Sequence, residues 1–355
     1  MNINSDPTGI DMHFDRRHSL TNLLENYTPS APETVSIEMF RKWSAARQEQ
    51  FNQHRAARIA AGVVVKTRQI DELTTEIRRE SAFAHRTIGR TGVIVNGPPT
   101  MGKTTAAFNA MVGAFRQHVR RYPDWKRDGH IPCVYVEVPP GSTAKGIMGR
   151  FLRFLDIPFI EKMTLEARTQ LVTQHLQRAH TSLVVIDEMQ NLARVSNGTF
   201  ESAQAIKNLL NAVKCVPLYV GFNLDRLFAH DDLGRQFAAR STVVELEPMP
   251  YRTTQAVKEW KGLIRAFETQ FALFNHPTNT LIPHAEYLWQ RTHGSIAALS
   301  RLLTIAALDV IDLDPDDQVI TIERLQTIKL DLATEQRFAA LITPTKNAKG
   351  ARRAA

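Results

Sequence analysis

The sequence has few cysteines and lacks any long apolar run. Only two of its 355 residues are cysteines, and both of them, Cys133 and Cys215, lie inside short apolar stretches. We expect them to be buried, reduced thiols. No charged-then-apolar leader opens the chain, and no run approaches the roughly 20 apolar residues that a membrane-spanning helix needs. These absences predict a cytoplasmic protein that has no membrane partner.

The composition is typical of an ordered globular protein with an excess of basic residues. Hydrophobic residues make up 43% and charged residues 23%, which argues against disorder for the bulk of the chain. The formal net charge is +8. A charge of this sign favours an acidic partner, of which nucleic acid is the commonest, although solubility alone would also account for it.

Changes in composition and in the pattern of apolar residues along the chain predict four segments. The first has a weakly ordered beginning, up to about residue 35, followed by a basic amphipathic helix; another helix is expected at Thr67–Ala84. The last segment is rich in alanine and basic residues and has no core residues. The segments are 1–60, an N-terminal arm and basic helix; 61–250, a nucleotide-binding domain; 251–342, a helical lid; and 343–355, a flexible basic tail.

Five short apolar runs in the second segment predict β-strands. They are separated by stretches of helical length, and they are apolar enough to be buried on both faces of a sheet. This pattern indicates an α/β fold with a central parallel sheet. The runs are Gly92–Asn96, Cys133–Val138, Leu183–Asp187, Val216–Gly221 and Thr242–Leu246.

A glycine-rich loop follows the first of these strands. It fits the Walker A pattern G-x-x-x-x-G-K-S/T at every fixed position and precedes an amphipathic helix. In this context, backbone N–H groups and a helix N-terminus converge on phosphate oxygens. We expect Lys103 to reach the β- and γ-phosphates of ATP, Thr104 to bind Mg²⁺, and Thr105 to cap the helix or face the α-phosphate. The predicted nucleotide-binding residues are Gly97, Pro98, Pro99, Thr100, Met101, Gly102, Lys103, Thr104 and Thr105.

An acidic pair ends the third predicted strand, as in a Walker B motif. Asp187 is predicted to hold the Mg²⁺ with its hydration shell, since open α/β sheets bind ligands at the carboxyl ends of their strands. Glu188 stands where a general base can polarise the attacking water. An Asp-Glu pair after a strand is also a common turn. Phosphate-transferring P-loop kinases do not need this glutamate, so the pair favours hydrolysis of ATP over transfer.

These residues resemble an AAA+ ATPase of the TniB/TnsC type, a family of ATP-dependent regulators of DNA transposition. The resemblance covers roughly residues 60 to 310. Asp187–Leu192 is similar to the family's DE-x-H-N-L stretch, with Gln190 in place of histidine, and Val138–Thr143 is similar to the segment that leads into a helix facing DNA. The implied fold is a P-loop ATPase with a central parallel sheet flanked by helices and followed by a small helical lid.

The resemblance also implies roles for polar residues outside the Walker motifs. Asn223, at the end of the fourth strand, matches a sensor near the γ-phosphate. Arg240, or else Arg235, is expected to act as an arginine finger on the ATP of a neighbouring subunit. Ala297 occupies the position where many relatives carry a sensor 2 arginine.

Duplex DNA is the partner that the resemblance implies, with contacts from Thr143, Lys145 and Arg150 to the phosphate backbone. The alternative for this segment is a solvated helix start in which Ser142 or Thr143 is the N-cap.

The expected function is a regulator that assembles with ATP on target DNA as a homo-oligomeric ring or filament, recruits a transposase and disassembles on hydrolysis. Two alternatives stay open. One is a helicase loader or secretion motor, and the other is a signalling or defence switch, whose ATPase activity would be indifferent to DNA.

Overall fold

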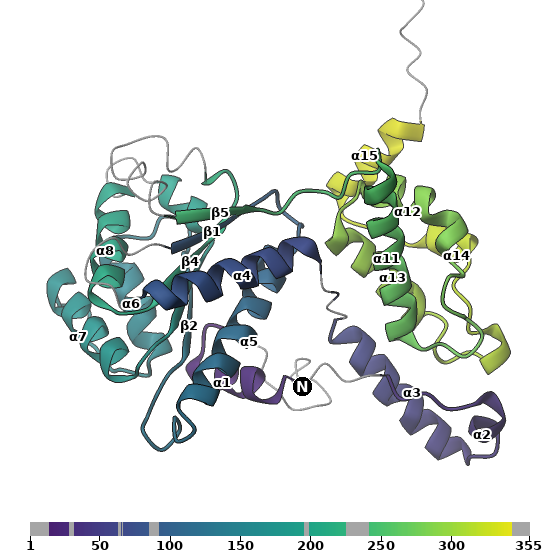
Figure 1. Cartoon of the computed structure of the whole chain (residues 1–355), viewed down its shortest axis with the longest axis horizontal. Helices are drawn as coiled ribbons and strands as arrows, with labels where there is room; N and C mark the ends of the chain where they lie inside the picture. Colours follow the sequence, from purple (N-terminus) through teal and green to yellow (C-terminus); the bar gives the residue numbers. More distant parts are fainter. Residues whose placement is uncertain are drawn as a thin grey trace, which may run out of the picture. The chain divides into compact units, whose positions relative to one another are not determined.

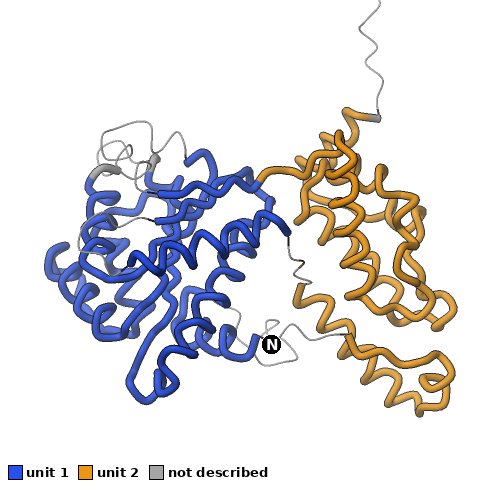
Figure 2. Tube along the Cα trace, in the orientation of Figure 1, with its two compact units in different colours: residues 1–29, 66–246 blue, residues 30–65, 247–355 orange. Residues whose placement is uncertain are grey.

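The computed structural model describes residues 14–27, 32–62, 65, 67–84, 92–194, 199–224 and 241–342. The chain forms two compact units (Figures 1 and 2). Unit 1 comprises Met1–Pro29 and Lys66–Leu246, and unit 2 comprises Ser30–Val65 and Glu247–Ala355. The predicted segment 1–60 is therefore divided, because its two halves bury their apolar residues in different cores. The predicted tail, 343–355, lies outside the described residues.

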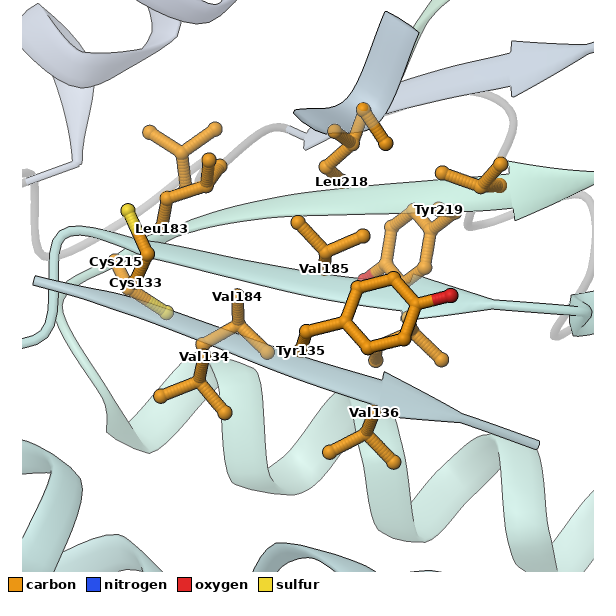
Figure 3. Packing of buried hydrophobic residues seen from close by; sticks show 14 of the residues in the cluster. Cys133, Val134, Tyr135, Val136, Leu183, Val184, Val185, Cys215, Leu218 and Tyr219 are labelled. Atoms are coloured by element: carbon orange, nitrogen blue, oxygen red, sulfur yellow. The ribbon is translucent and has the colours of Figure 1, made fainter. Parts of the chain in front are cut away.

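Unit 1 is built on a sheet of five parallel strands in the order β2-β3-β4-β1-β5. Each strand agrees with a predicted run to within one residue at either end, so the predicted fold class is confirmed. Side chains of β2 and β3 alternate between the two faces, with Tyr135 and Val185 on one face and Val134 and Val184 on the other (Figure 3). The strands are β1 (Gly92–Asn96), β2 (Cys133–Glu137), β3 (Leu183–Asp187), β4 (Val216–Gly221) and β5 (Ser241–Glu245).

Two groups of helices pack around this sheet (Figure 1). Helix α5 adjoins both α1 and α4, and α6, α7 and α8 form the other group. Cys133 and Cys215 are both buried, as predicted. The helices of unit 1 are α1 (Arg17–Asn26), α4 (Arg68–Phe83), α5 (Lys103–Arg121), α6 (Ala144–Phe154), α7 (Leu165–Arg178) and α8 (Thr199–Ala212), with a 3-10 helix, η1, at Met189–Arg194.

Helix α1 corrects the prediction of weak order for residues 14–27, the described part of the chain's beginning. Its leucines lie at helical spacing and form an apolar stripe. Leu20 and Leu24 are 0% and 2% exposed in the core of unit 1. A short stripe of this kind is weak as a sequence signal, and it becomes decisive only when a neighbouring helix such as α5 covers it.

Unit 2 is helical, and its core gathers around the fully buried Trp260. The predicted helix over residues 36–60 is two helices, because Ser44 caps the second one by accepting a hydrogen bond from the backbone N of Arg47. The chain from Ile322 to Ile342 forms two short helices. The helices are α2 (Ile37–Arg41), α3 (Ala45–Ala60), α11 (Thr254–Phe271), α12 (Ala285–Thr292), α13 (Ile296–Leu308), α14 (Ile322–Thr327) and α15 (Leu332–Ile342), with 3-10 helices η2 (Ile282–His284) and η3 (Pro315–Asp317).

Several arginines of the predicted basic helix make contacts within unit 2. Arg55 is buried and donates to the carbonyl oxygen of Ala272 at 2.9 Å. Arg58 donates to the carbonyl oxygen of Gln270, and Arg41 forms an ion pair with Asp314 at 3.0 Å. These basic groups therefore help to attach the N-terminal helices to the helical unit.

Within the described segments, no helix is both long enough and apolar enough to cross a membrane.

Candidate nucleotide site

Three adjacent strand ends bring the predicted site residues to one edge of the sheet. Strand β4 lies between β1 and β3. The Walker A loop follows β1, Asp187 ends β3, and Asn223 follows β4 by two residues. Because all three strands are parallel, their carboxyl ends meet at the same edge, where open α/β sheets bind ligands. The sheet therefore brings residues separated by up to 126 positions in the sequence (Gly97 to Asn223) to the same edge.

The conformation of the Walker A loop depends on two glycines. Gly102 is the N-cap of α5 and has a φ of 81°, in the left-handed region that favours glycine. A Cβ on Gly97 would lie 2.5 Å from the carbonyl oxygen of Leu246, which is closer than real contacts allow. Gly97 thus permits the close approach of two backbones, and Gly102 permits the turn into the helix.

The amine of Lys103 lies against the loop that precedes it. Nζ donates to the carbonyl oxygens of Gly97 at 2.9 Å and Pro98 at 2.8 Å. Desolvation lowers the pKa of Lys103, while the charges of Glu188 and Asp187 act in the opposite direction. The loop therefore carries a partly desolvated cation at the N-terminus of α5, an arrangement suited to an anion.

Asp187 is 2% exposed and accepts hydrogen bonds from three directions. Its Oδ2 lies 3.2 Å from Oγ1 of Thr104 and 2.8 Å from the hydroxyl of Tyr135. Its Oδ1 accepts from the backbone N of Glu188 at 2.8 Å. A carboxylate and a hydroxyl meeting beside a phosphate-binding loop are the hard oxygen donors that Mg²⁺ takes, so the residues present fit the predicted metal.

Glu188 is held by a residue whose contacts the sequence did not reveal. It has a φ of 59°, and Nε2 of Gln190 donates to its carboxylate. Oε1 of Gln190 accepts from the backbone N of Phe222 at 3.2 Å. Gln190 therefore joins Glu188 to the end of β4. In the sequence, Gln190 stands out only as a departure from the family's histidine.

Of the three other predicted catalytic residues, the structure describes only Asn223. Asn223 is exposed, has a φ of 53° and lies two residues beyond the end of β4. Asn96 fixes this end of β4, since its Oδ1 accepts from the backbone N of Leu224 at 3.1 Å. Arg235 and Arg240 lie outside the described residues, so their role as an arginine finger stays a prediction.

The predicted DNA contacts lie at the start of α6. Thr143 is the N-cap, and its Oγ1 accepts from the backbone N of Gly146 at 3.1 Å. This hydrogen bond accounts for Thr143 without DNA, in line with the alternative considered for it. Lys145 and Arg150 are partly exposed, and at 3.6 residues per turn they are about 140° apart around the helix, so they do not share one face.

The sheet order, the phosphate-binding loop after β1 and the acidic pair after β3 define an ATPase of the AAA+ class. A family model described as "Bacterial TniB protein" matches residues 55–250. The match covers more than half of the chain, and the chain belongs to the TniB family. A search of curated protein sequences found no match.

Two solved structures are similar to this chain at low sequence identity. The Aeropyrum pernix ORC1 protein, solved in complex with DNA, has a TM-score of 0.50 and 15% identity over 71% of this chain and 63% of its own. Cdc6p from Pyrobaculum aerophilum has a TM-score of 0.48 and 15% identity over 74% of this chain and 66% of its own. The matched part is less than two thirds of the length of either protein.

Proposed function

We propose that this TniB-family protein is an ATP- and Mg²⁺-dependent regulator of DNA transposition. With ATP it assembles on target DNA, where it recruits or activates a transposase, and hydrolysis dismantles the assembly. The observation that carries the proposal is the meeting of Thr104, Asp187 and Glu188 beside the Walker A loop, in a chain of the TniB family.

In this proposal, ATP supplies the phosphoanhydride bond that is cleaved. Bound Mg²⁺ would neutralise negative charge on the phosphate oxygens. The loop amides and Lys103 hold the phosphates, while Thr104 and Asp187 hold the metal ion. Glu188 accepts the proton of the attacking water. Asn223 orients that water or the terminal phosphate from the end of β4.

Gln190 holds the carboxylate of Glu188, and replacing Gln190 by alanine is expected to slow ATP hydrolysis. The variant Gln190→Ala removes the amide that fixes the Glu188 carboxylate. A hydrogen bond to a charged group is worth about 1.5–3 kcal/mol, so kcat should fall about tenfold or more. Steady-state ATPase assays together with nucleotide binding would measure this loss.

A matched control for Gln190 is Gln204→Ala, because the Gln204 amide donates to Asn208 on the same helix. Unchanged turnover is expected for this variant. Equal kcat values for Gln190→Ala and the wild-type protein would show that Glu188 needs no support from Gln190.

The proposed assembly is head to tail, with each subunit completing the site of the next. Arg240 is the preferred finger, and Arg235 is the alternative. A heterologous contact of this kind closes into a ring or continues as a helical filament. Hydrolysis would then depend on protein concentration, because an isolated subunit lacks the arginine that stabilises transition-state charge.

The proposed DNA contacts rest on Lys145, Arg150 and the net charge of +8. Basic side chains that contact phosphate oxygens bind duplex DNA without reading its sequence. The arginines of α2 and α3 described above are engaged within unit 2. In unit 1 the proposed contacts come from α6, where Lys145 and Arg150 lie on different faces and would each contact a different phosphate.

Duplex DNA is expected to stimulate the ATPase, and the stimulation should weaken as salt rises, because phosphate contacts release counterions. The double variant Lys145→Ala, Arg150→Ala removes two such contacts and should lower the salt slope of DNA binding by about 2. ATPase rates and DNA binding at several salt concentrations would measure both effects.

A control with the same loss of charge is Lys162→Ala, Arg178→Ala, at two exposed positions on other parts of unit 1. This variant should keep the wild-type salt slope. If both double variants lost stimulation equally, α6 would not be the DNA contact. Equal ATPase rates with and without duplex DNA would favour the signalling or defence switch.

A further inference from the structure

Tyr135 is a polar-tipped residue in the middle of an otherwise apolar strand. In the register of the sheet it pairs with Val185, and Glu137 pairs with Asp187. Because side chains alternate along a strand, Tyr135 and Asp187 lie on the same face, two register positions apart. The Tyr135 ring lies along β2 with its hydroxyl toward the carboxyl end of the strand (Figure 3). This direction brings the hydroxyl to the predicted metal ligand.

The hydroxyl of Tyr135 donates to Oδ2 of Asp187 at 2.8 Å, the oxygen that also accepts from Thr104. Tyr135 is 6% exposed. Burial, followed by the nearby charge of Asp187, raises the pKa of Tyr135. The phenol therefore stays protonated across the neutral pH range and remains a donor to the carboxylate.

The N-terminal segment packs on the ring of Tyr135. Phe14 lies edge-on to it with ring centroids 5.5 Å apart, and Phe14 also stacks on Phe108 of α5 at 5.4 Å. Tyr27, beyond the other end of α1, meets Phe108 edge-on at 5.1 Å. Phe108 is thus enclosed by rings from both ends of residues 14–27.

Further contacts hold this segment on unit 1. Arg116 of α5 donates to the carbonyl oxygen of Tyr27 at 2.8 Å, and Lys126 pairs with Glu25 at 2.5 Å. Leu20 and Leu24 of α1 are buried in the core of unit 1. Residues 14–27 are therefore a docked element whose first described residue touches the Tyr135 ring.

We propose that Tyr135 is a positioning residue for Asp187, and that Phe14 of the N-terminal segment holds the Tyr135 ring in place. The inference rests on the proposed function, since it assigns Asp187 to Mg²⁺. Groups that hydrogen-bond to metal ligands fix the orientation of those ligands, and their loss typically weakens metal binding by about 10–100-fold.

The direct test is Tyr135→Phe, which removes the hydroxyl and keeps the ring with its packing. Binding of a fluorescent ATP analogue would be titrated in the presence of Mg²⁺ and again in EDTA. We expect the Mg²⁺-dependent affinity to fall about tenfold and the affinity in EDTA to stay at the wild-type value. A purely structural role would move both affinities together or neither.

Tyr219→Phe is the matched control. Tyr219 is 4% exposed on β4 and pairs with Ile186, so it lies on the opposite face of the sheet from Tyr135. It loses the same atom from a similarly buried ring, and its Mg²⁺-dependent affinity is expected to remain that of the wild type.

Phe14→Leu tests the second half of the proposal, because it removes the ring contact and leaves the Tyr135 hydroxyl intact. A loss of about threefold in Mg²⁺-dependent affinity is expected, since an aromatic pair is worth about 0.5–1.5 kcal/mol beyond its buried area. Thermal unfolding of each variant would confirm that it folds. If Tyr135→Phe does not fold, Phe14→Leu still tests the proposal.

Unchanged Mg²⁺-dependent affinity in both variants, with normal nucleotide binding by the wild-type protein, would overturn this inference alone. A wild-type protein that binds no nucleotide would overturn the proposed function, and the inference with it.

Discussion

The variant Glu188→Gln is expected to hydrolyse ATP about 10²- to 10⁴-fold more slowly than the wild-type protein, which is the range typical of losing a general base. The amide has the same shape as the carboxylate but cannot accept the proton of the attacking water. Its carbonyl oxygen can still accept from Gln190, which holds the wild-type carboxylate. Single-turnover hydrolysis would measure the loss, and nucleotide binding should be retained.

Glu137→Gln is the control for this variant. Glu137 ends β2, is exposed, and pairs with Asp187 in the sheet register, so it is a carboxylate at the same edge. The Glu137→Gln variant should hydrolyse ATP at the wild-type rate.

The DNA-bound assembly of Glu188→Gln should persist under conditions in which the wild-type assembly dissociates, because hydrolysis is the proposed trigger of disassembly. Wild-type turnover by Glu188→Gln would remove this residue from the proposed mechanism.

Replacing Lys103 by alanine is expected to weaken ATP binding about 100-fold. The amine is the cation of the Walker A loop, and two charge-assisted hydrogen bonds to phosphate oxygens contribute together about 3 kcal/mol, which converts to about 100-fold in affinity. In the structure the amine bonds only to the loop's own carbonyl oxygens among its described contacts. Its removal should therefore leave the fold intact.

Equilibrium binding of a fluorescent ATP analogue would measure this loss, and a thermal unfolding curve would show that the variant folds. Lys162→Ala, in the exposed connection between α6 and α7, loses the same charge and should bind ATP normally. Equal affinity of Lys103→Ala and the wild-type protein would place the nucleotide elsewhere.

The strands and the Walker A loop could be predicted because their signals are local. A short run of apolar residues, such as the four that precede Asp187, indicates a strand, and the pattern from Gly97 to Thr104 contains its own spacing. The order of the strands in the sheet comes from the structure. The sequence could nevertheless assign Asp187 and Thr104 to one site, because each of the two Walker motifs is formed by neighbouring residues.

The partners of the acidic pair could not be predicted in this way. Tyr135 and Asp187 are 52 positions apart, and their hydrogen bond exists only because β2 and β3 pair in one particular register. Gln190 reaches the backbone of Phe222, 32 positions away. Such contacts depend on which strands are neighbours and how they are aligned, and neither property is visible in hydrophobic periodicity.

The N-terminal region shows the same limit on a larger scale. Its helices carry apolar stripes that a sequence can reveal, but a stripe does not specify the surface that covers it. Leu20 is buried in the core of unit 1, whereas Ile59 is buried in that of unit 2.

By itself, then, the sequence determined the α/β class, the phosphate-binding loop and the acidic pair, because these depend on residues close together in the chain. The tertiary structure alone decided that Tyr135 and Gln190 support that pair and that the N-terminal region belongs to both units. The physical reason is that burial and hydrogen bonding between distant segments are satisfied only once the strands and helices have packed together.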